Sequence, residues 1–423
     1  MTVMKQVILL VAFSPLAYAT ELAEGVKVGE VTSSSALIWV RTSTGRAADG
    51  SVAGSADRVT VACVGVKPIQ AQTDASRDFT HLFELTALKP ATEYTCEATP
   101  GSGAKRQFRF RTAPVASASS RVAFTVVTGL MYRDLDDPRG YKIAEAMVKQ
   151  KPDFLVLTGD NVYYDNEPPR ATTPEIARFH WQRMYSLPRL IALFSSVPAY
   201  WEKDDHDILS DDCWPGKDPD FMKPMTFVQG LEIFAQQTPV RGAPYRGVRW
   251  GKWLEAWLLE GREFRSPNTM PDGPGKTILG QAQKRWLKES VAKSNAKWKV
   301  IVSPTPWVGP DRATKGDNYA NKVFATEGGE MRAWASKFPN LFVVTGDRHW
   351  QYHSVDPATR LEEFSCGPAS DEHAGGTPGE NKEYHRFHRL KGGYAGVEAT
   401  ADGRLFLRLH DVNGAVVYEQ ERK

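Results

Sequence analysis

The sequence has no long apolar stretch beyond its N-terminal segment, few cysteines and no excess of charge of either sign. A transmembrane helix needs roughly 18 consecutive apolar residues, and no later stretch reaches that length, so we expect no transmembrane segment. The 53 lysine and arginine residues are almost balanced by 50 aspartate and glutamate residues. Proteins that bind nucleic acids usually carry a basic face, and this balance makes no such surface evident. With 423 residues, 24% of them charged, the chain is long enough for two or three folded domains.

Residues 1–19 have the pattern of a secretory signal peptide. Lys5 supplies a positive charge, Val7 to Phe13 form an apolar run, and Ala17-Tyr18-Ala19 is a small-residue cleavage site. The alternative interpretation is a buried first helix or strand. We predict an exported protein, periplasmic or extracellular. Because the segment has no twin-arginine pair, we expect the chain to cross the membrane unfolded.

The four cysteines suit an oxidising compartment, where disulfides persist. Cys63 and Cys96 lie in the N-terminal part of the chain, and Cys213 and Cys366 lie in the remainder. Of the three possible pairings, Cys63–Cys96 with Cys213–Cys366 is the simplest, because each bridge stays within one region. Free, buried thiols are the alternative.

Residues 22–113 have the pattern of an all-β domain. Strand-like runs at 36–41 and 59–64 are separated by clusters of serine, threonine, glycine and aspartate. The segment from Leu88 to Tyr94 resembles the corner of fibronectin type III modules, in which a tyrosine hydroxyl binds the backbone upstream. We therefore predict a fibronectin type III-like β-sandwich, followed by a short linker.

From residue 120 to 423 apolar strands alternate with helices. Continuous apolar runs predict buried strands at 122–127, 154–157, 197–200, 300–302 and 341–344. Helices are predicted at 140–151, at 281–293, at 330–337, and from Pro174 after the capping residues Thr172 and Thr173. This alternation favours an α/β fold with a largely parallel sheet covered on both faces. The tail, 393–421, indicates a β-meander, and 211–275 has no readable periodicity.

Polar residues directly follow several of these strands. Gly159-Asp160, with Tyr163, follows one strand; Asp204-Asp205-His206-Asp207 follows the next; Gly346-Asp347-Arg348-His349 follows a third. Ligands bind beyond the carboxyl ends of the strands in open α/β sheets, so these side chains should converge. Carboxylates and imidazoles without cysteine suit Ca, Mg, Mn, Fe or Zn. Each segment alone is compatible with a turn or a solvated loop, and it is their combination that predicts a metal site.

The same segments resemble the motifs of the calcineurin-like metallophosphoesterases, and within them the alkaline phosphatase D (PhoD-like) family. The family's Gly-Asp-x-x-Tyr, Asp-Asp-His-Glu and Gly-Asp-x-His correspond to 159–163, 204–207 and 346–349, with Asp207 in place of the glutamate. The resemblance covers residues 25–423. It implies a fibronectin-like module followed by a PhoD-like metallophosphoesterase domain over 120–423, with two sheets flanked by helices in four layers.

The resemblance also implies residue roles. Asp160 would bridge two metal ions, Tyr163 and His349 would bind the first, and Asp205 and Asp347 would bind the second. His206 would contact the phosphoryl group or assist the leaving oxygen. Two or more ions are implied, Ca²⁺ with Fe or with another divalent ion such as Mn²⁺ or Zn²⁺.

The implied activity is hydrolysis of phosphate monoesters, diesters or both by attack of a metal-bound hydroxide. The substrate would be a small-molecule phosphate ester or a phospholipid. Arg348 would offset charge that develops on the phosphoryl oxygens, and pairing with a surface aspartate is the alternative for this residue. The polar loop 365–373 is expected at the rim of the site, with a role in substrate binding.

One position departs from the family pattern. The family usually has a cysteine just after the first strand as an iron ligand, whereas this chain reads Thr128-Gly129-Leu130, and Asp134 is a candidate to reach in from the following loop. A catalytically degenerate binding protein is therefore one alternative. Another metal-dependent esterase, such as a sulfatase, is disfavoured because no Cys/Ser-x-Pro-x-Arg segment supplies its nucleophile.

Overall fold

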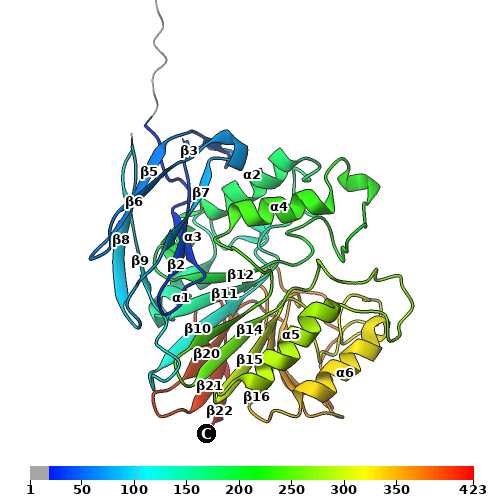
Figure 1. The fold of residues 1–423 in the computed structure, drawn as a ribbon. Coiled ribbons are helices and arrows are strands. Elements are labelled where there is room, and N and C mark those ends of the chain that lie inside the picture. The colour runs from blue at the N-terminus through cyan, green and yellow to red at the C-terminus, as the bar shows by residue number, and fades with distance from the viewer. Residues whose placement is uncertain (1–18, 102) are drawn as a thin grey trace, which may run out of the picture.

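The computed structural model describes residues 19–101 and 103–423, so the predicted signal peptide lies outside the described residues except for its last position. Up to residue 111 the described chain is built mainly of strands: β1 (Val26–Gly29), β2 (Ala36–Arg41), β3 (Ser43–Arg46), β4 (Val52–Gly54), β5 (Arg58–Cys63), β6 (Ile69–Gln72), β7 (Thr80–Leu85), β8 (Glu93–Pro100) and β9 (Arg106–Arg111). Strands β6-β5-β8-β9 form one sheet, and Figure 1 shows them as a layer beside β2 and β7.

Two local predictions for this region can be compared with the structure. The backbone N–H of Lys89 donates to the Tyr94 hydroxyl oxygen at 2.8 Å, as the tyrosine-corner interpretation requires. Cys63 and Cys96 are directly opposite each other on β5 and β8 and form a disulfide. The first predicted bridge is therefore confirmed.

The second predicted bridge is wrong. Cys213 and Cys366 are free and buried, and their thiols donate to different carbonyl groups, those of Asp205 and Thr345. Cys213 packs under the helices, whereas Cys366 packs between the two large sheets. Their separate surroundings satisfy both thiols without a covalent bond.

A nine-stranded sheet runs through most of the molecule in the order β22-β21-β20-β10-β11-β12-β1-β2-β7. Its further members are β10 (Val122–Val127), β11 (Phe154–Thr158), β12 (Ala199–Glu202), β20 (Tyr394–Ala399), β21 (Leu405–His410) and β22 (Val416–Arg422). Strand β1 pairs with β12 in parallel and with β2 antiparallel, so N-terminal strands extend the sheet of the second region. The division into a sandwich over 22–113 and a separate domain from 120 stays a prediction.

A second, seven-stranded sheet has the order β13-β14-β15-β16-β18-β17-β19. Its strands are β13 (Arg246–Trp250), β14 (Leu254–Leu258), β15 (Trp298–Ser303), β16 (Leu341–Thr345), β17 (Gln351–Val355), β18 (Glu362–Cys366) and β19 (His385–Arg389). Three neighbouring pairs are parallel in each large sheet, and the other pairs are antiparallel. The prediction of a largely parallel sheet is wrong, because short connections such as those of the β20–β22 meander allow only antiparallel neighbours.

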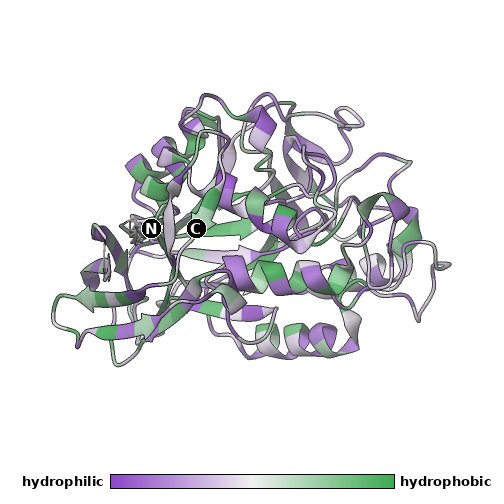
Figure 2. Ribbon diagram, turned by 90° about the horizontal axis from the view of Figure 1, so that it is seen from above, coloured by the Kyte–Doolittle hydropathy of each residue, from purple (hydrophilic) through white to green (hydrophobic). Residues whose placement is uncertain are grey.

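The two large sheets pack face to face, with helices on their outer faces. Apolar side chains of β10 and β11 share one core with those of β15 and β16. The nine-stranded sheet is covered by α1 (Lys142–Gln150), α2 (Pro174–Tyr185), α3 (Pro188–Phe194) and α4 (Phe227–Gln237), and the other sheet by α5 (Gly280–Lys293) and α6 (Ala325–Ala335). The fold is thus mixed α/β with the four layers expected. In Figure 2 the central strands are largely green, and the helices alternate between green and purple along their length, as one buried face requires.

The helices agree with the sequence in part. Helix α2 begins at Pro174, and the Thr173 side chain accepts from the backbone N–H of Ile176, as its capping role predicts. Helix α6 begins at Ala325, earlier than the predicted 330. Helix α4 lies in the segment where no periodicity was recognised. None of the helices in the described part of the chain is long and apolar enough to cross a membrane.

Candidate metal centre

The loops that follow β10, β11, β12, β15, β16 and β18 meet around a cavity of about 320 Å³. Five residues predicted for the site line it: Asp160, Tyr163, His206, Asp347 and His349. The other lining residues are Met131, Arg133, Asn166, Asp211, Arg312, Lys315 and His373. The predicted convergence of the strand ends is therefore confirmed, since these residues come from opposite sheets and from loops far apart in the sequence.

Two glycines let the strand ends approach closely. A Cβ atom on Gly159, whose φ is +93°, would lie 2.4 Å from the Asp204 Cβ and 2.5 Å from its backbone nitrogen. A Cβ atom on Gly346 would lie 2.3 Å from the Thr158 hydroxyl oxygen. Both distances are far shorter than van der Waals contact, so only glycine lets the neighbouring strand ends come this close. The aspartate that follows each glycine lines the cavity.

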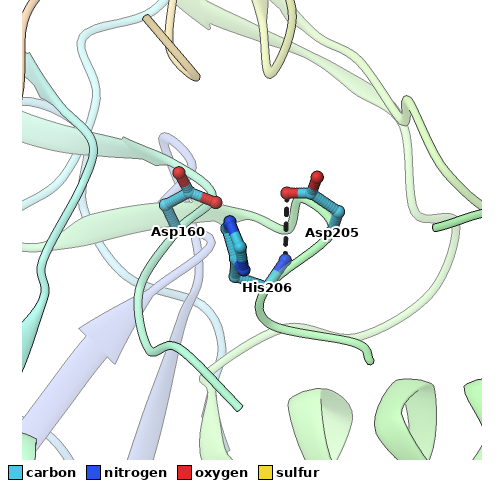
Figure 3. A group of neighbouring side chains, drawn as sticks. All are labelled: Asp160, Asp205 and His206. Carbon is cyan, nitrogen blue, oxygen red and sulfur yellow. Dashed lines mark hydrogen bonds between the residues drawn. The ribbon is translucent and has the colours of Figure 1, made fainter. Parts of the chain in front are cut away.

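Asp160, Asp205 and His206 form the centre of the group (Figure 3). One ligand atom from each lies within 4.8 Å of the others. The His206 backbone N–H donates to Asp205 Oδ1 at 3.0 Å, the dashed line in Figure 3, and fixes that carboxylate. Two buried carboxylates this close to each other are oxygen donors that a single cation can share, with the imidazole of His206 beside them.

The phenol of Tyr163 contacts both Asp160 and the ring of His206, whose centre lies 4.4 Å from its own. Its hydroxyl donates to Asp160 Oδ2 at 3.0 Å, and its oxygen lies 2.9 Å from His373 Nε2 and 3.4 Å from His349 Nε2. His349 Nε2 is also 3.6 Å from Asp160 Oδ2. Burial lowers the pKa of His349 well below its usual value, so the imidazole is neutral and keeps a lone pair.

His206 is held between two acids. Its Nδ1 lies 2.7 Å from Asp165 Oδ1, and its Nε2 lies 3.9 Å from Asp211 Oδ1. Burial lowers the pKa of His206, but the charges of Asp165 and Asp205 outweigh burial and raise the pKa well above its usual value. The two acids therefore favour the protonated, imidazolium form of this ring on the wall of the cavity.

The electrostatics of the cavity favour a bound cation. Burial raises the pKa of Asp160 well above its usual range, and nearby carboxylates add to the rise although His206 opposes it. Burial also raises the pKa of Tyr163, with the charge of Asp160 as the next cause. Among the described residues, no hydrogen-bond partner reaches the buried Asp160 Oδ1. A cation would supply that partner and favour the ionised form of both side chains, so the residues present fit a metal.

Arg348 lies outside the cavity. Its guanidinium is 3.0 Å from Asp311 and 3.8 Å from Asp317, and it also contacts Asp347. Asp311 and Asp317 are fully buried, so these partners are not the surface aspartate considered as an alternative. The structure does not bring Arg348 together with His206, and a direct catalytic role for Arg348 stays a prediction without support from its position.

Several cavity residues were missed or only partly expected. His373 belongs to the loop predicted at the rim, but the sequence did not single it out. Asp134, the candidate replacement for the missing cysteine, does not reach Tyr163; its Oδ2 lies 2.7 Å from His373 Nδ1 instead. Arg312 and Lys315 come from the loop after β15, and the only signal for them is that this strand, too, ends at the same edge.

Comparison with known proteins agrees with the motifs. The PhoD-like phosphatase family matches residues 124–394, which confirms the resemblance. A solved structure described as PhoD superposes with a TM-score of 0.78 at 17% identity, covering 97% of this chain and 90% of the other. The purple acid phosphatase PPD1 from yellow lupin (Lupinus luteus) seeds superposes with a TM-score of 0.66 at 12% identity, covering 96% and 74%. At these identities the two structures show a common fold only. No curated protein sequence matches the chain.

Proposed function

We propose, since the chain belongs to the PhoD-like phosphatase family, that it is an exported metal-dependent phosphoesterase acting on phosphate monoesters, diesters or both. The observation that carries this proposal is that the carboxylates of Asp160 and Asp205 lie within 4.8 Å of each other and of the His206 imidazole at the strand ends. The two carboxylates could hold a cation, with the imidazole beside it. The buried, unpartnered oxygen of Asp160 adds support, because a carboxylate oxygen in such a place is costly without a cation.

The ligand assignment is the one that the family resemblance implies, with Asp160 between the two ions. Tyr163 and His349 would bind one ion beside it, and Asp205 with Asp347 would bind a second ion. When bound, such a pair of ions supplies an activated water and neutralises charge on the phosphoryl oxygens. The oxygen-rich side suits Ca²⁺ or Mn²⁺, whereas the side with imidazole suits Fe or Zn²⁺.

His206 is the proposed proton donor to the leaving oxygen. Its Nδ1 hydrogen is held by Asp165 at 2.7 Å, so the proton available for transfer is the one on Nε2. Asp165 thereby acts as a positioning residue that sets the orientation of the ring and favours its charged form. General acid catalysis of this kind contributes roughly 10²- to 10⁴-fold to a rate.

The cations of the cavity wall support an anionic substrate. Arg133, Arg312 and Lys315 line the same cavity as His206. Lys315 is bound by Asp211 at 3.1 Å and by Asp212 at 2.7 Å, which fixes its ammonium group. We assign to these three side chains the role of attracting the phosphoryl group and offsetting its charge, in place of the role predicted for Arg348.

Export is the remaining part of the proposal. The signal-peptide pattern of residues 1–19 supports it. The Cys63–Cys96 disulfide supports it independently, since such bonds persist in oxidising compartments.

The test is turnover of phenyl phosphate and of bis(4-nitrophenyl) phosphate by the purified chain, before and after treatment with a chelator. We expect hydrolysis of at least one ester, its loss with the chelator and its return with added metal. Asp160→Asn should abolish turnover, whereas Asp220→Asn, at a side chain that is 92% exposed, should leave it unchanged. Chelator-resistant turnover, or none under any metal supply, would refute the proposal.

A further inference from the structure

His373 occupies a place in the cavity that the proposed ligand assignment does not use. Its side chain is only 8% exposed. Its Nε2 lies 2.9 Å from the Tyr163 oxygen, and its ring centre lies 4.1 Å from that of His349. Two imidazoles, one phenol and the carboxylate of Asp160 therefore face the same small volume.

The tautomer of His373 is fixed by Asp134. The Nδ1 atom lies 2.7 Å from Asp134 Oδ2, and an ionised carboxylate only accepts hydrogen bonds. Nδ1 must therefore carry the hydrogen, which leaves the Nε2 lone pair pointing towards Tyr163. A carboxylate that holds the far nitrogen of an imidazole in this way is the usual outer partner of a metal-binding histidine.

The single hydroxyl hydrogen of Tyr163 cannot satisfy all of the acceptor atoms that surround its oxygen. The phenol has a single hydrogen, which it donates to Asp160 at 3.0 Å. The Nε2 atoms of His373 and His349, at 2.9 and 3.4 Å, then both face an oxygen that has no second hydrogen to offer. A cation placed among them would accept all of these lone pairs at once.

The loop that carries His373 is fixed at both of its ends. Thr128 forms a parallel bridge with Pro368, which ties the loop to the end of β10. The Gly375 backbone N–H donates to the His349 carbonyl oxygen at 3.0 Å. The position of the imidazole is therefore set by the same strand ends that set the other ligands.

The residue after Thr128 leaves room for this imidazole. A Cβ atom on Gly129 would lie 3.2 Å from Cδ2 of His373. A larger residue at this position would direct its side chain at the ring. The imidazole thus fills the space that a side chain following β10 would otherwise take.

We propose that His373 is a metal ligand, binding through Nε2 beside Tyr163 and His349, and that Asp134 is the positioning residue that orients it. The ligand set of this ion is then two imidazoles, one phenol oxygen and one carboxylate, which suits a divalent transition ion such as Zn²⁺ or Fe²⁺ rather than Ca²⁺. The inference rests on the proposed metal dependence of the chain.

The test is metal binding by the full chain, with Zn²⁺ alone for stoichiometry and affinity and Co²⁺ alone for the visible spectrum. The wild type should hold two Zn²⁺ ions after dialysis, and His373→Gln should hold one. Asp134→Asn should keep two sites but weaken one by roughly 10- to 100-fold, as loss of an outer partner does. His388→Gln is the matched control, because His388 lies on β19 and its Nε2 is 2.8 Å from the Thr377 hydroxyl oxygen.

The Co²⁺ spectrum separates ligation from a merely structural role. Loss of an imidazole ligand changes the intensity and position of the visible bands, whereas loosening of the loop alone does not. A folded His373→Gln protein with two Zn²⁺ ions and an unchanged Co²⁺ spectrum would overturn the inference and leave the proposed function standing. A wild-type chain that binds neither ion would overturn both. If His373→Gln fails to fold, a wild-type Zn²⁺ affinity in Asp134→Asn overturns the orienting role, and weaker binding supports it.

Discussion

Replacing Gly159 by alanine tests whether the site depends on direct contact between two strand ends. The new Cβ atom would lie 2.4 Å from the Asp204 side chain and 2.5 Å from the Asp204 backbone nitrogen. Backbone atoms cannot rotate away as a flexible side chain does, so one of the two loops must move. That movement would separate Asp160, which follows Gly159, from Asp205, which follows Asp204.

The cost can be worked out against a matched glycine. Gly159 and Gly216 have φ values of +93° and +86°, but nothing lies within 4 Å of a Cβ atom on Gly216. Alanine in the left-handed region costs about 1–2 kcal/mol at either position. Overpacking adds about 1–3 kcal/mol at Gly159 only. We expect Gly159→Ala to lower the free energy of unfolding by about 2–5 kcal/mol and Gly216→Ala by about 1–2 kcal/mol.

The assay is urea unfolding followed by tryptophan fluorescence, for which the chain has 12 tryptophans. The Zn²⁺ content of both variants is measured in parallel. Gly159→Ala should bind less metal than the wild type even where it is folded, whereas Gly216→Ala should bind the same amount. Equal losses of stability in the two variants, with equal metal content, would refute the argument that close approach of the loops builds the site.

Other contacts lead to further expected results. His206→Gln should slow hydrolysis of phenyl phosphate by roughly 10²- to 10⁴-fold. It should slow hydrolysis of 4-nitrophenyl phosphate much less, because nitrophenolate leaves without a proton. Equal losses of rate for the two esters would contradict the role of proton donor. Burial lowers the pKa of His180 to about 4, so the unfolded chain takes up the proton first as the pH falls. The free energy of unfolding should therefore decrease between about pH 6.5 and pH 4, by up to about 3 kcal/mol, and it should decrease less in His180→Gln. If the variant has the same pH dependence as the wild type, His180 is not the cause. Burial raises the pKa of Cys213 and Cys366 to about 12. A thiol reagent should therefore label no thiol in the native protein and two in the denatured, unreduced chain. If no thiol is labelled after denaturation, the two cysteines form a disulfide after all.

The residues that reach the cavity were predictable because their position depends on local sequence. A continuous apolar run such as 154–157 specifies a buried strand, and the polar residue that ends it must lie at the sheet edge. This reasoning needs no knowledge of which strand pairs with which. It therefore placed Asp160, His206 and His349 at the cavity correctly although the predicted sheet was too parallel.

Features that depend on long-range pairing were not predictable in this way. The failure of Cys213–Cys366 is one example, because no spacing rule states which surfaces two distant thiols will face. The parallel pairing of β1 with β12 is another, since β1 has only four residues and its sequence suits either sheet. His373 lies in an irregular loop, where no periodicity fixes the direction of a side chain.

Helix α4 was missed although a signal for it exists. The Thr226 side chain accepts from the backbone N–H of Gln229, and the Gln229 side chain accepts from the backbone N–H of Thr226. This reciprocal arrangement is a capping box, which can be recognised as Thr-x-x-Gln before an apolar segment. The helix also contains Gly230, which weakens its intrinsic helical preference.

The four consecutive residues Asp204 to Asp207 show how one motif serves both chemistry and folding. The Asp207 carboxylate accepts from the backbone N–H groups of Asn161, Val162 and Asp204 at 2.7, 3.2 and 2.9 Å. It thus joins the loop after β11 to the loop after β12 and does not line the cavity.

Asp204 has a similar structural role, because its fully buried carboxylate pairs with the guanidinium of Arg262. Asp205 also lies 3.4 Å from this guanidinium and accepts from the backbone N–H groups of His206 and Asp212, but together with His206 it faces Asp160. A motif match predicts that all four residues matter, but it cannot say which of them act on a ligand. That distinction depends on where the partners of each carboxylate lie. Asp207 binds backbone amides and Asp204 binds the buried Arg262, and these contacts hold Asp205 and His206 in place.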